Sequence, residues 1–205
     1  AELVGMSFSY AENQAFYVPV PAERSEALKI VNEFKELLEN ENTLKVGQNI
    51  KYDMLVLSNY GVEVRGPMFD TMIAHYVLQP ELRHNMDYLA EIYLNYRTIA
   101  IEELIGAKGK KQGNMRDLTP EQVYEYACED ADITMQLWNK LQPRLMEQEG
   151  LWQLFTEIEM PLVDVLADME MSGVAIDTNA LSDVSRFFNQ RKQARQYVQM
   201  LGMFS

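Results

Sequence analysis

The sequence contains few residues that form covalent cross-links or bind soft metals. Cys128 is the single cysteine among 205 residues, and only two histidines are present, His75 and His84. One cysteine excludes an intrachain disulfide and a cysteine-rich zinc motif, and two isolated histidines do not make a zinc site. This cysteine usage predicts a reducing, cytoplasmic compartment.

The sequence also lacks a surplus of positive charge and a long apolar run. Its 31 acidic and 18 basic residues give a formal net charge of −13. A broad basic face for nucleic acid is therefore excluded, because such binding depends on Lys and Arg neutralising phosphates. No apolar run is long enough to cross a bilayer and no signal peptide is recognisable, so we expect no membrane partner.

The residues that are present, 47% of them apolar, alternate between strand-like and helix-like patterns. Alternating apolar side chains predict a β-hairpin from residues 3–10 and 15–20, and a buried strand at 43–46. Helical patterns are predicted at residues 24–39, 52–60, 71–78 and 86–95. Strands and helices in succession indicate an α/β fold with a substantial core.

The clearest helix start is Thr119-Pro120-Glu121-Gln122, where threonine and proline precede a glutamine at the capping-box position. Apolar side chains repeat along one face of the helix that follows, and Asp130 falls on that face. Burying an unpaired carboxylate is costly, so Asp130 needs a metal or a hydrogen-bond donor. Asp132 points elsewhere and is expected to be solvated or a structural acceptor.

Two short segments each place a polar residue four positions before an aspartate: Asn49 before Asp53, and Tyr126 before Asp130. This spacing stacks both side chains on one helical face. Two such faces could hold a divalent metal and a water, since hard cations take carboxylate oxygens. Asn49 also fits a helix N-cap, and Tyr126 also fits a core aromatic, while Asp70 is predicted to be an N-cap.

The segment from residue 106 to 113 is rich in glycine and lysine but lacks the spacing of a phosphate-binding loop. A flexible, solvated basic loop is predicted, with contact of its lysines and Arg116 to a nucleic-acid backbone as the alternative. Further on, a long helix from residue 151 is interrupted by Pro161 and ends at Ser172-Gly173. Another helix is predicted to begin at Thr178.

The longer strings around the two acidic segments resemble a known family. Residues 44–53 and 126–134 are similar to the second and third motifs of the 3′-to-5′ proofreading exonuclease domain of bacterial DNA polymerase I, a family A polymerase. The segments between and after them agree with that family as well, and the resemblance weakens after about Ala180. These further segments are residues 69–72, 83–90, 158–163 and 173–177.

The resemblance implies a ribonuclease H-like fold, with a mixed sheet flanked by helices. It implies an exonuclease domain over residues 1–150 and a short helical start of the polymerase domain over residues 151–205. The family's first motif, Asp-x-Glu on the opening strand, would come just before the segment at residues 3–8 and has no match. We therefore expect the opening strand to be missing and the chain by itself to be inactive.

The resemblance also implies roles for individual residues. Asp130 would be a direct metal ligand, Asp53 a ligand acting largely through metal-bound waters, and Tyr126 the hydroxyl that orients the attacking water. Contacts to the terminal nucleotide are implied for Gln48, Asn49 and Arg83, and contact to the frayed strand for Ile101. The cofactor would be Mg²⁺ or Mn²⁺ in a two-metal site that these residues supply only in part.

The implied function is proofreading: removal of the 3′-terminal nucleotide from single-stranded or frayed DNA during replication and repair. The implied partners are that DNA end and the palm, fingers and thumb of the polymerase. The alternative is a catalytically silent scaffold or a single-strand docking module beside the polymerase. An RNA-trimming exonuclease of the ribonuclease D kind would share the metal chemistry, but residues 158–177 continue as the polymerase family does.

Overall fold

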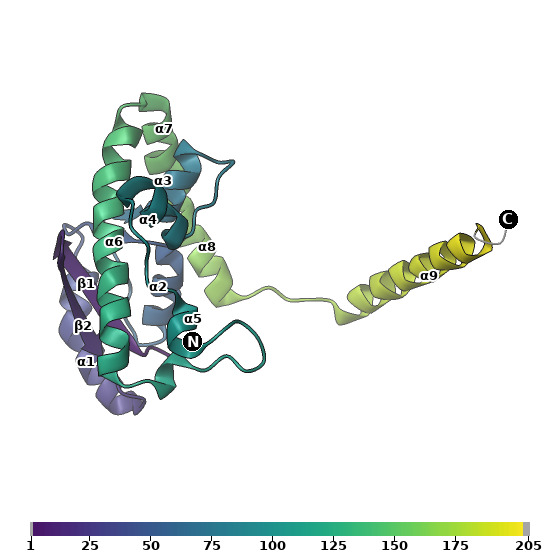
Figure 1. Cartoon of the computed structure of the whole chain (residues 1–205), viewed down its shortest axis with the longest axis horizontal. Coiled ribbons are helices and arrows are strands. Elements are labelled where there is room, and N and C mark those ends of the chain that lie inside the picture. The colour runs from purple at the N-terminus through teal and green to yellow at the C-terminus, as the bar shows by residue number, and fades with distance from the viewer. Residues whose placement is uncertain (1, 203–205) are drawn as a thin grey trace. The chain divides into compact units, whose positions relative to one another are not determined.

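The structure, a computed structural model, describes residues 2–202, with side-chain exposure described up to Lys192. Its contacts divide the chain into one compact unit that ends at Met171 and a second that begins at Ser172. Figure 1 shows the strands and most of the helices in the first unit and the single helix α9 in the second. No helix of the described residues is both long and apolar enough to cross a membrane.

The predicted hairpin is present. Strands β1 (Gly5–Ala11) and β2 (Gln14–Pro19) pair antiparallel, with Phe8 opposite Phe16. Asn13 closes the turn with a φ of 62°, a left-handed conformation that asparagine tolerates better than most residues.

The first unit contains a second strand pair. Strand β3 (Lys45–Gly47) runs parallel to β4 (Met68–Asp70), and in the described residues the two strand pairs are separate sheets. Parallel pairing requires a crossover, which helix α2 (Ile50–Ser58) supplies between the two strands. The sheets are small and helices predominate, as expected for an α/β chain of mixed strand direction.

The other helices fill the sequence between and after the strands. They are α1 (Arg24–Leu38), α3 (Thr71–Leu78), α4 (Met86–Leu94), α5 (Ile101–Ile105), α6 (Pro120–Met146), α7 (Glu149–Leu154), α8 (Met160–Ser172) and α9 (Thr178–Gly202). Helix α6 is the longest, and it packs against the hairpin, β3, α3, α4, α5 and α7 (Figure 1). Its predicted start is confirmed: the Gln122 side chain accepts a hydrogen bond from the Thr119 backbone N–H at 2.9 Å.

Apolar side chains form two cores in the first unit. One core lies under α1, with Val20, Val31, Leu57 and Val62 among its members. The other lies between α3, α4, α6 and the α7–α8 segment, and it includes Phe69, Leu89, Leu137 and Phe155. The partly buried Met54 and Met68 pack against both cores, so α2 and β4 connect them.

Pro161 changes the helix that carries it, as predicted. A π-helical turn, Phe155–Glu159, separates α7 from α8, and the Met160 N–H donates to the Phe155 carbonyl five residues before it. Proline has no N–H to continue the α-helical bonding, which accounts for a wider turn just before it. Phe155 within this turn is buried, 4.7 Å from the Phe69 ring centroid to centroid.

The second unit is a short extended segment followed by α9. Gly173 has a φ of 72°, which ends α8 at a residue without a Cβ. The Asp177 carboxylate accepts hydrogen bonds from the backbone N–H groups of Asn179 and Ala180 at 2.9 and 3.0 Å. This N-cap confirms the predicted helix start at Thr178.

Candidate active site

Asp70 joins the starts of two helices. One of its carboxylate oxygens accepts from the N–H groups of Met72 and Ile73 at 2.8 and 3.1 Å, which confirms its predicted N-cap role on α3. Its other oxygen accepts from the Ile50 N–H at 2.7 Å, at the first residue of α2. Asn49 holds the N-cap position of α2 with a φ of 65°, but its side chain makes no capping hydrogen bond. The exposed Asn49 amide therefore remains available for a ligand.

Asp53 lies one turn into α2, close to Asp70. Its side chain reaches solvent, yet the surrounding protein, and secondarily the Asp70 carboxylate, raises the pKa of Asp53 to about 7. A carboxylate in such surroundings gains from a nearby cation more than an ordinary surface carboxylate does. Asp53 thus has the electrostatic character expected of a metal-binding group.

Tyr126 and Asp130 lie one helical turn apart on α6, and both residues are half-buried. Burial is the main cause that raises the pKa of Asp130 to about 7; the nearby Tyr126 hydroxyl opposes this shift, and Glu129 and Asp87 add to it. Burial and Asp130 also raise the pKa of the Tyr126 hydroxyl, so it keeps its proton. The requirement for a metal or a donor at Asp130 stays a prediction.

The two neighbouring acids hold the segment between α4 and α5. Glu129 accepts from the Tyr96 hydroxyl and from the Ile99 N–H, both at 2.7 Å. Asp87 accepts from the Thr98 hydroxyl at 2.9 Å. No local sequence pattern signals these contacts beyond the position of Glu129 beside Asp130, because they join residues that are separated in the chain.

This segment leads directly to Ile101, the first residue of α5, whose side chain is 37% exposed. An apolar side chain on the surface at this place is compatible with contact to a base. The sequence-predicted residue is therefore accessible, and its backbone position depends on the carboxylates of α4 and α6.

Gln48 and Arg83 are brought to the same part of the fold. The Gln48 side-chain nitrogen donates to the His84 carbonyl at 2.8 Å, and its oxygen accepts from the Thr71 hydroxyl. Thr71 also donates to the Gly47 carbonyl at 3.1 Å. Gln48 thus fixes the loop that carries the exposed Arg83.

The predicted metal ligands lie in two separate carboxylate groups. Asp53 is influenced by Asp70, whereas Asp130 is influenced by Glu129 and Asp87. Within the described residues, no group of three or more His, Cys, Asp or Glu side chains is placed to hold a metal ion. The donor chemistry fits a hard divalent cation in part, and such a cation would need further oxygen ligands from water or phosphate.

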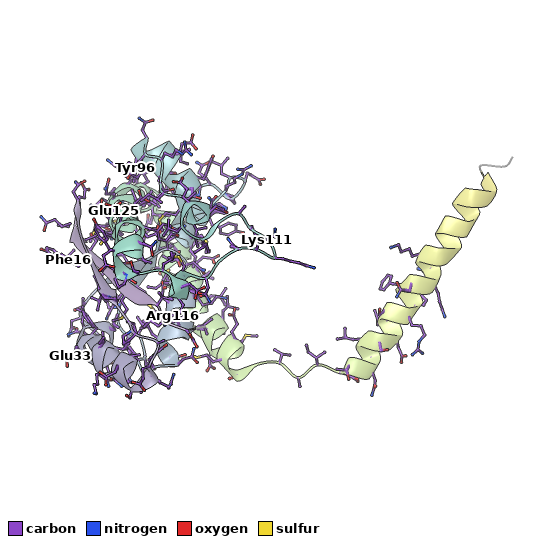
Figure 2. All side chains as sticks on the ribbon, turned by 60° about the horizontal axis from the view of Figure 1, so that its bottom comes forward. Phe16, Glu33, Tyr96, Lys111, Arg116 and Glu125 are labelled. Atoms are coloured by element: carbon purple, nitrogen blue, oxygen red, sulfur yellow. The ribbon has the colours of Figure 1, made fainter. Side chains whose placement is uncertain are left out.

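Two other polar residues serve the fold. Asp132 accepts from the Asn13 N–H and from the Gln136 side chain, so it is the structural acceptor that was expected. Arg116 donates to the carbonyls of Val20 and Leu3 at the open end of the hairpin. Its guanidinium is therefore occupied by the protein, while Lys111 lies on a loop that projects from the unit (Figure 2).

Comparison with known proteins identifies the family of the chain. A model of the 3′-5′ exonuclease family matches residues 1–146. The chain is 40% identical to DNA polymerase I of Pseudomonas aeruginosa over 95% of its length, and 36% identical to DNA polymerase I of Borreliella burgdorferi over 88%. It spans 22% and 20% of those polymerases, about a fifth of their length.

Solved structures share the fold. The polymerase domain of Pol1 from M. smegmatis, in complex with DNA primer-template and dNTP, matches with a TM-score of 0.67 and 21% identity, over 96% of this chain and 30% of that one. Brucella melitensis NrnC with bound Mg²⁺ matches with a TM-score of 0.63 and 20% identity, over 84% and 78%. The predicted fold class, α/β of the ribonuclease H-like exonuclease type, is confirmed. Because the family model matches most of the chain and its relatives are up to 40% identical, the chain belongs to the 3′-5′ exonuclease family of DNA polymerase I.

Proposed function

We propose that the protein containing this chain removes 3′-terminal nucleotides from single-stranded or frayed DNA by metal-assisted hydrolysis. The observation that carries the proposal is the half-buried Asp130 on α6, whose pKa is raised to about 7 mainly by burial and which lies one helical turn from the Tyr126 hydroxyl. A carboxyl with this pKa binds a proton or a cation readily at neutral pH. The tyrosine beside it keeps its proton and can hold a water in place.

The metal-binding residues would be Asp130, by direct contact, and Asp53, through water. Bound Mg²⁺ or Mn²⁺ would supply the positive charge that activates water and neutralises the departing 3′-oxygen. NrnC, which shares the fold, has been seen with bound Mg²⁺, and this supports a divalent metal here. Deprotonated Asp53 and Asp130 would place negative charge at the site, and the Tyr126 hydroxyl, which keeps its proton, would orient the attacking water.

The DNA strand would be held by Gln48, Asn49, Arg83 and Ile101. The Asn49 amide and the Arg83 side chain are exposed, and so is the apolar Ile101 at the start of α5. Arginine suits a phosphate and an apolar side chain suits a base, so together they fit a strand with separated bases. A mispaired 3′ end separates more easily than a paired one, which would give proofreading. The palm, fingers and thumb of the polymerase would deliver that end, in the cytoplasm.

The test uses the full-length polymerase that contains this chain. Release of mononucleotides from single-stranded DNA in Mg²⁺ is measured for the wild type and for Asp130→Ala, whose turnover is expected to fall by about 100-fold or more. Glu33→Gln, on the exposed face of α1, is the matched control and is expected to keep wild-type turnover. Wild-type turnover in Asp130→Ala would exclude the ligand role.

A catalytically silent scaffold is the second candidate. It is favoured by one observation: the described residues hold no group of three or more potential metal ligands. Titration of the 205-residue chain with Mn²⁺ is expected to show weak binding, because Asp53 and Asp130 lie in separate carboxylate groups. If the full-length polymerase also binds Mn²⁺ weakly and releases no nucleotide, the silent scaffold replaces the hydrolytic proposal.

A further inference from the structure

His75 is a buried titratable group that the proposed chemistry does not use. It lies in α3 with 0% exposure, and its Nδ1 is 2.7 Å from the Nδ1 of His84. An ion shared by two imidazoles would keep each nitrogen about 2 Å from itself, and so the two nitrogens about 3 Å or more apart. The observed distance therefore fits a direct imidazole–imidazole hydrogen bond.

The surroundings of His75 keep it neutral. Burial, and secondarily His84, lowers the pKa of His75 to about 4. The rings of Tyr88 and Tyr93 on α4 stand nearly perpendicular to the His75 ring, with centroids at 6.4 and 5.5 Å, and Arg144 of α6 stacks on Tyr93. A neutral imidazole has one donor and one acceptor nitrogen, so two neutral rings can share one hydrogen bond.

His84 connects the loop at residues 79–85 to the rest of the fold. Among the described residues, two hydrogen bonds join residues 82–85 to parts of the fold other than this loop and the adjoining α4. His84 makes both of them. Its ring bonds to His75, and its carbonyl accepts from Gln48. The Tyr76 ring packs edge-on against His84 at 5.4 Å. Arg83, the residue before His84, makes no side-chain hydrogen bond among the described residues and depends on this anchorage for its position.

We propose that His75 is a positioning residue, and that its hydrogen bond to His84 holds Arg83 and Gln48 in the arrangement that contacts the terminal nucleotide. The nucleotide contact rests on the proposed function, whereas the anchorage of the loop does not. A buried histidine costs more to desolvate than an apolar residue of similar size, so its use here is explained by the bond it makes. His75 acts through His84 and touches no reacting atom in this arrangement.

The first arm of the test uses the 205-residue chain. Nitrogen NMR of the histidine rings near neutral pH is expected to show one of the two rings protonated at Nδ1, as the shared bond requires. If both rings carry their proton at Nε2, the bond does not exist and the proposal is overturned. This measurement needs no variant and does not depend on DNA.

The second arm measures amide hydrogen exchange in the loop at Leu82, whose N–H donates to the Gln79 carbonyl, in variants of the same chain. His84→Phe keeps an aromatic ring but loses Nδ1, and exchange in the loop is expected to rise by about tenfold. His84→Asn, whose amide occupies the place of Nδ1, should restore protection, and the exposed Glu81→Gln is the control that should change nothing. Equal protection in His84→Phe and wild type would overturn the anchoring role. If His84→Phe does not fold, the ring tautomers of the wild type and the exchange rates of His84→Asn decide whether the bond anchors the loop.

The third arm relates the loop to the nucleotide in the full-length polymerase. His84→Phe is expected to raise KM for single-stranded DNA by about tenfold and to leave kcat within about twofold, with His84→Asn close to wild type. Faster amide exchange in the loop together with an unchanged KM would overturn the nucleotide part of the proposal and leave the proposed hydrolysis intact. A wild-type polymerase that hydrolyses nothing would refute the proposed function, and the exchange result would still decide the anchorage.

Discussion

At the level of single residues, the fold disfavours the charged form of the two aspartates in the candidate site. Asp53 and Asp130 each have a pKa of about 7, against an ordinary value of 3.8. The folded state binds their protons more tightly than the unfolded state does between these two values. The stability they contribute is therefore complete below about pH 4 and is lost as the pH rises through about 7. This pH-dependent cost of negative charge is what a bound cation would offset.

Asp130→Asn should therefore stabilise the chain in alkaline solution. At about pH 8 the melting temperature is expected to rise by about 2–4 °C, equivalent to about 1 kcal/mol after allowance for partial solvent screening. At about pH 5 the difference should be smaller, because Asp130 is then protonated in the folded state and only the unfolded state has ionised, and below about pH 4 it should vanish.

Thermal unfolding followed by circular dichroism at several pH values measures this difference. Glu33→Gln, on the exposed surface of α1 (Figure 2), removes the same charge from an open site and should show no such trend. A gain for Asp130→Asn that is no larger at pH 8 than at pH 5 would contradict the raised pKa.

Helix periodicity was enough to single out Asp130 as an acid on the inward face and to place Tyr126 one turn before it, because both lie on one element. The roles of Asp87, Glu129 and His75 could not be predicted in this way. Each depends on a partner from a different element: Thr98, Tyr96 and His84 respectively. Side-chain contacts over such sequence distances are set by tertiary packing, which a local pattern does not encode.

At the level of elements, the best predictions rested on capping chemistry. Asp70, Thr119 and Thr178 mark helix starts where the sequence placed them, because caps act within a few residues. The three-residue strand β4 and the five-residue helix α5 were not predicted. Elements this short carry little periodicity, and β4 exists because its backbone bonds to β3.

Arg116 should matter for stability rather than for DNA. Its guanidinium holds the Val20 and Leu3 carbonyls of the hairpin, and Arg116→Met would leave both without that partner. The free energy of unfolding is expected to fall by about 2 kcal/mol, which lowers the melting temperature by about 4–8 °C.

Lys111→Met is the matched control, because it removes the same charge from the projecting loop (Figure 2) and should leave the melting temperature unchanged. Both variants are compared by thermal unfolding and by the binding of a fluorescent single-stranded oligonucleotide. Unchanged stability with weakened oligonucleotide binding in Arg116→Met would assign the residue to DNA instead.

For the whole molecule, sequence resemblance and packing divide the chain at different places. The family model ends at residue 146. From the sequence, residues 1–150 are assigned to the exonuclease domain and residues 151–205 to the polymerase domain, and this division stays a prediction. The compact unit continues to Met171. Residues after 150 supply three buried members of the core around Phe69, namely Phe155, Met160 and Val163, and Ala167 is buried as well. By packing, the start of the predicted polymerase domain is part of the unit that carries the site.

Truncation separates these two boundaries. A chain of residues 1–171 keeps every buried residue of the described cores and is expected to melt within about 2 °C of the full chain. A chain of residues 1–150 loses Phe155 and three other buried side chains, and the loss of a buried phenylalanine alone costs about 3–5 kcal/mol. Since a domain is stable by only about 5–15 kcal/mol, the shorter chain should lose cooperative unfolding. Circular dichroism melts of both chains measure this, and equal, cooperative melting of 1–150 and 1–171 would show that the α7–α8 segment is dispensable for the exonuclease unit.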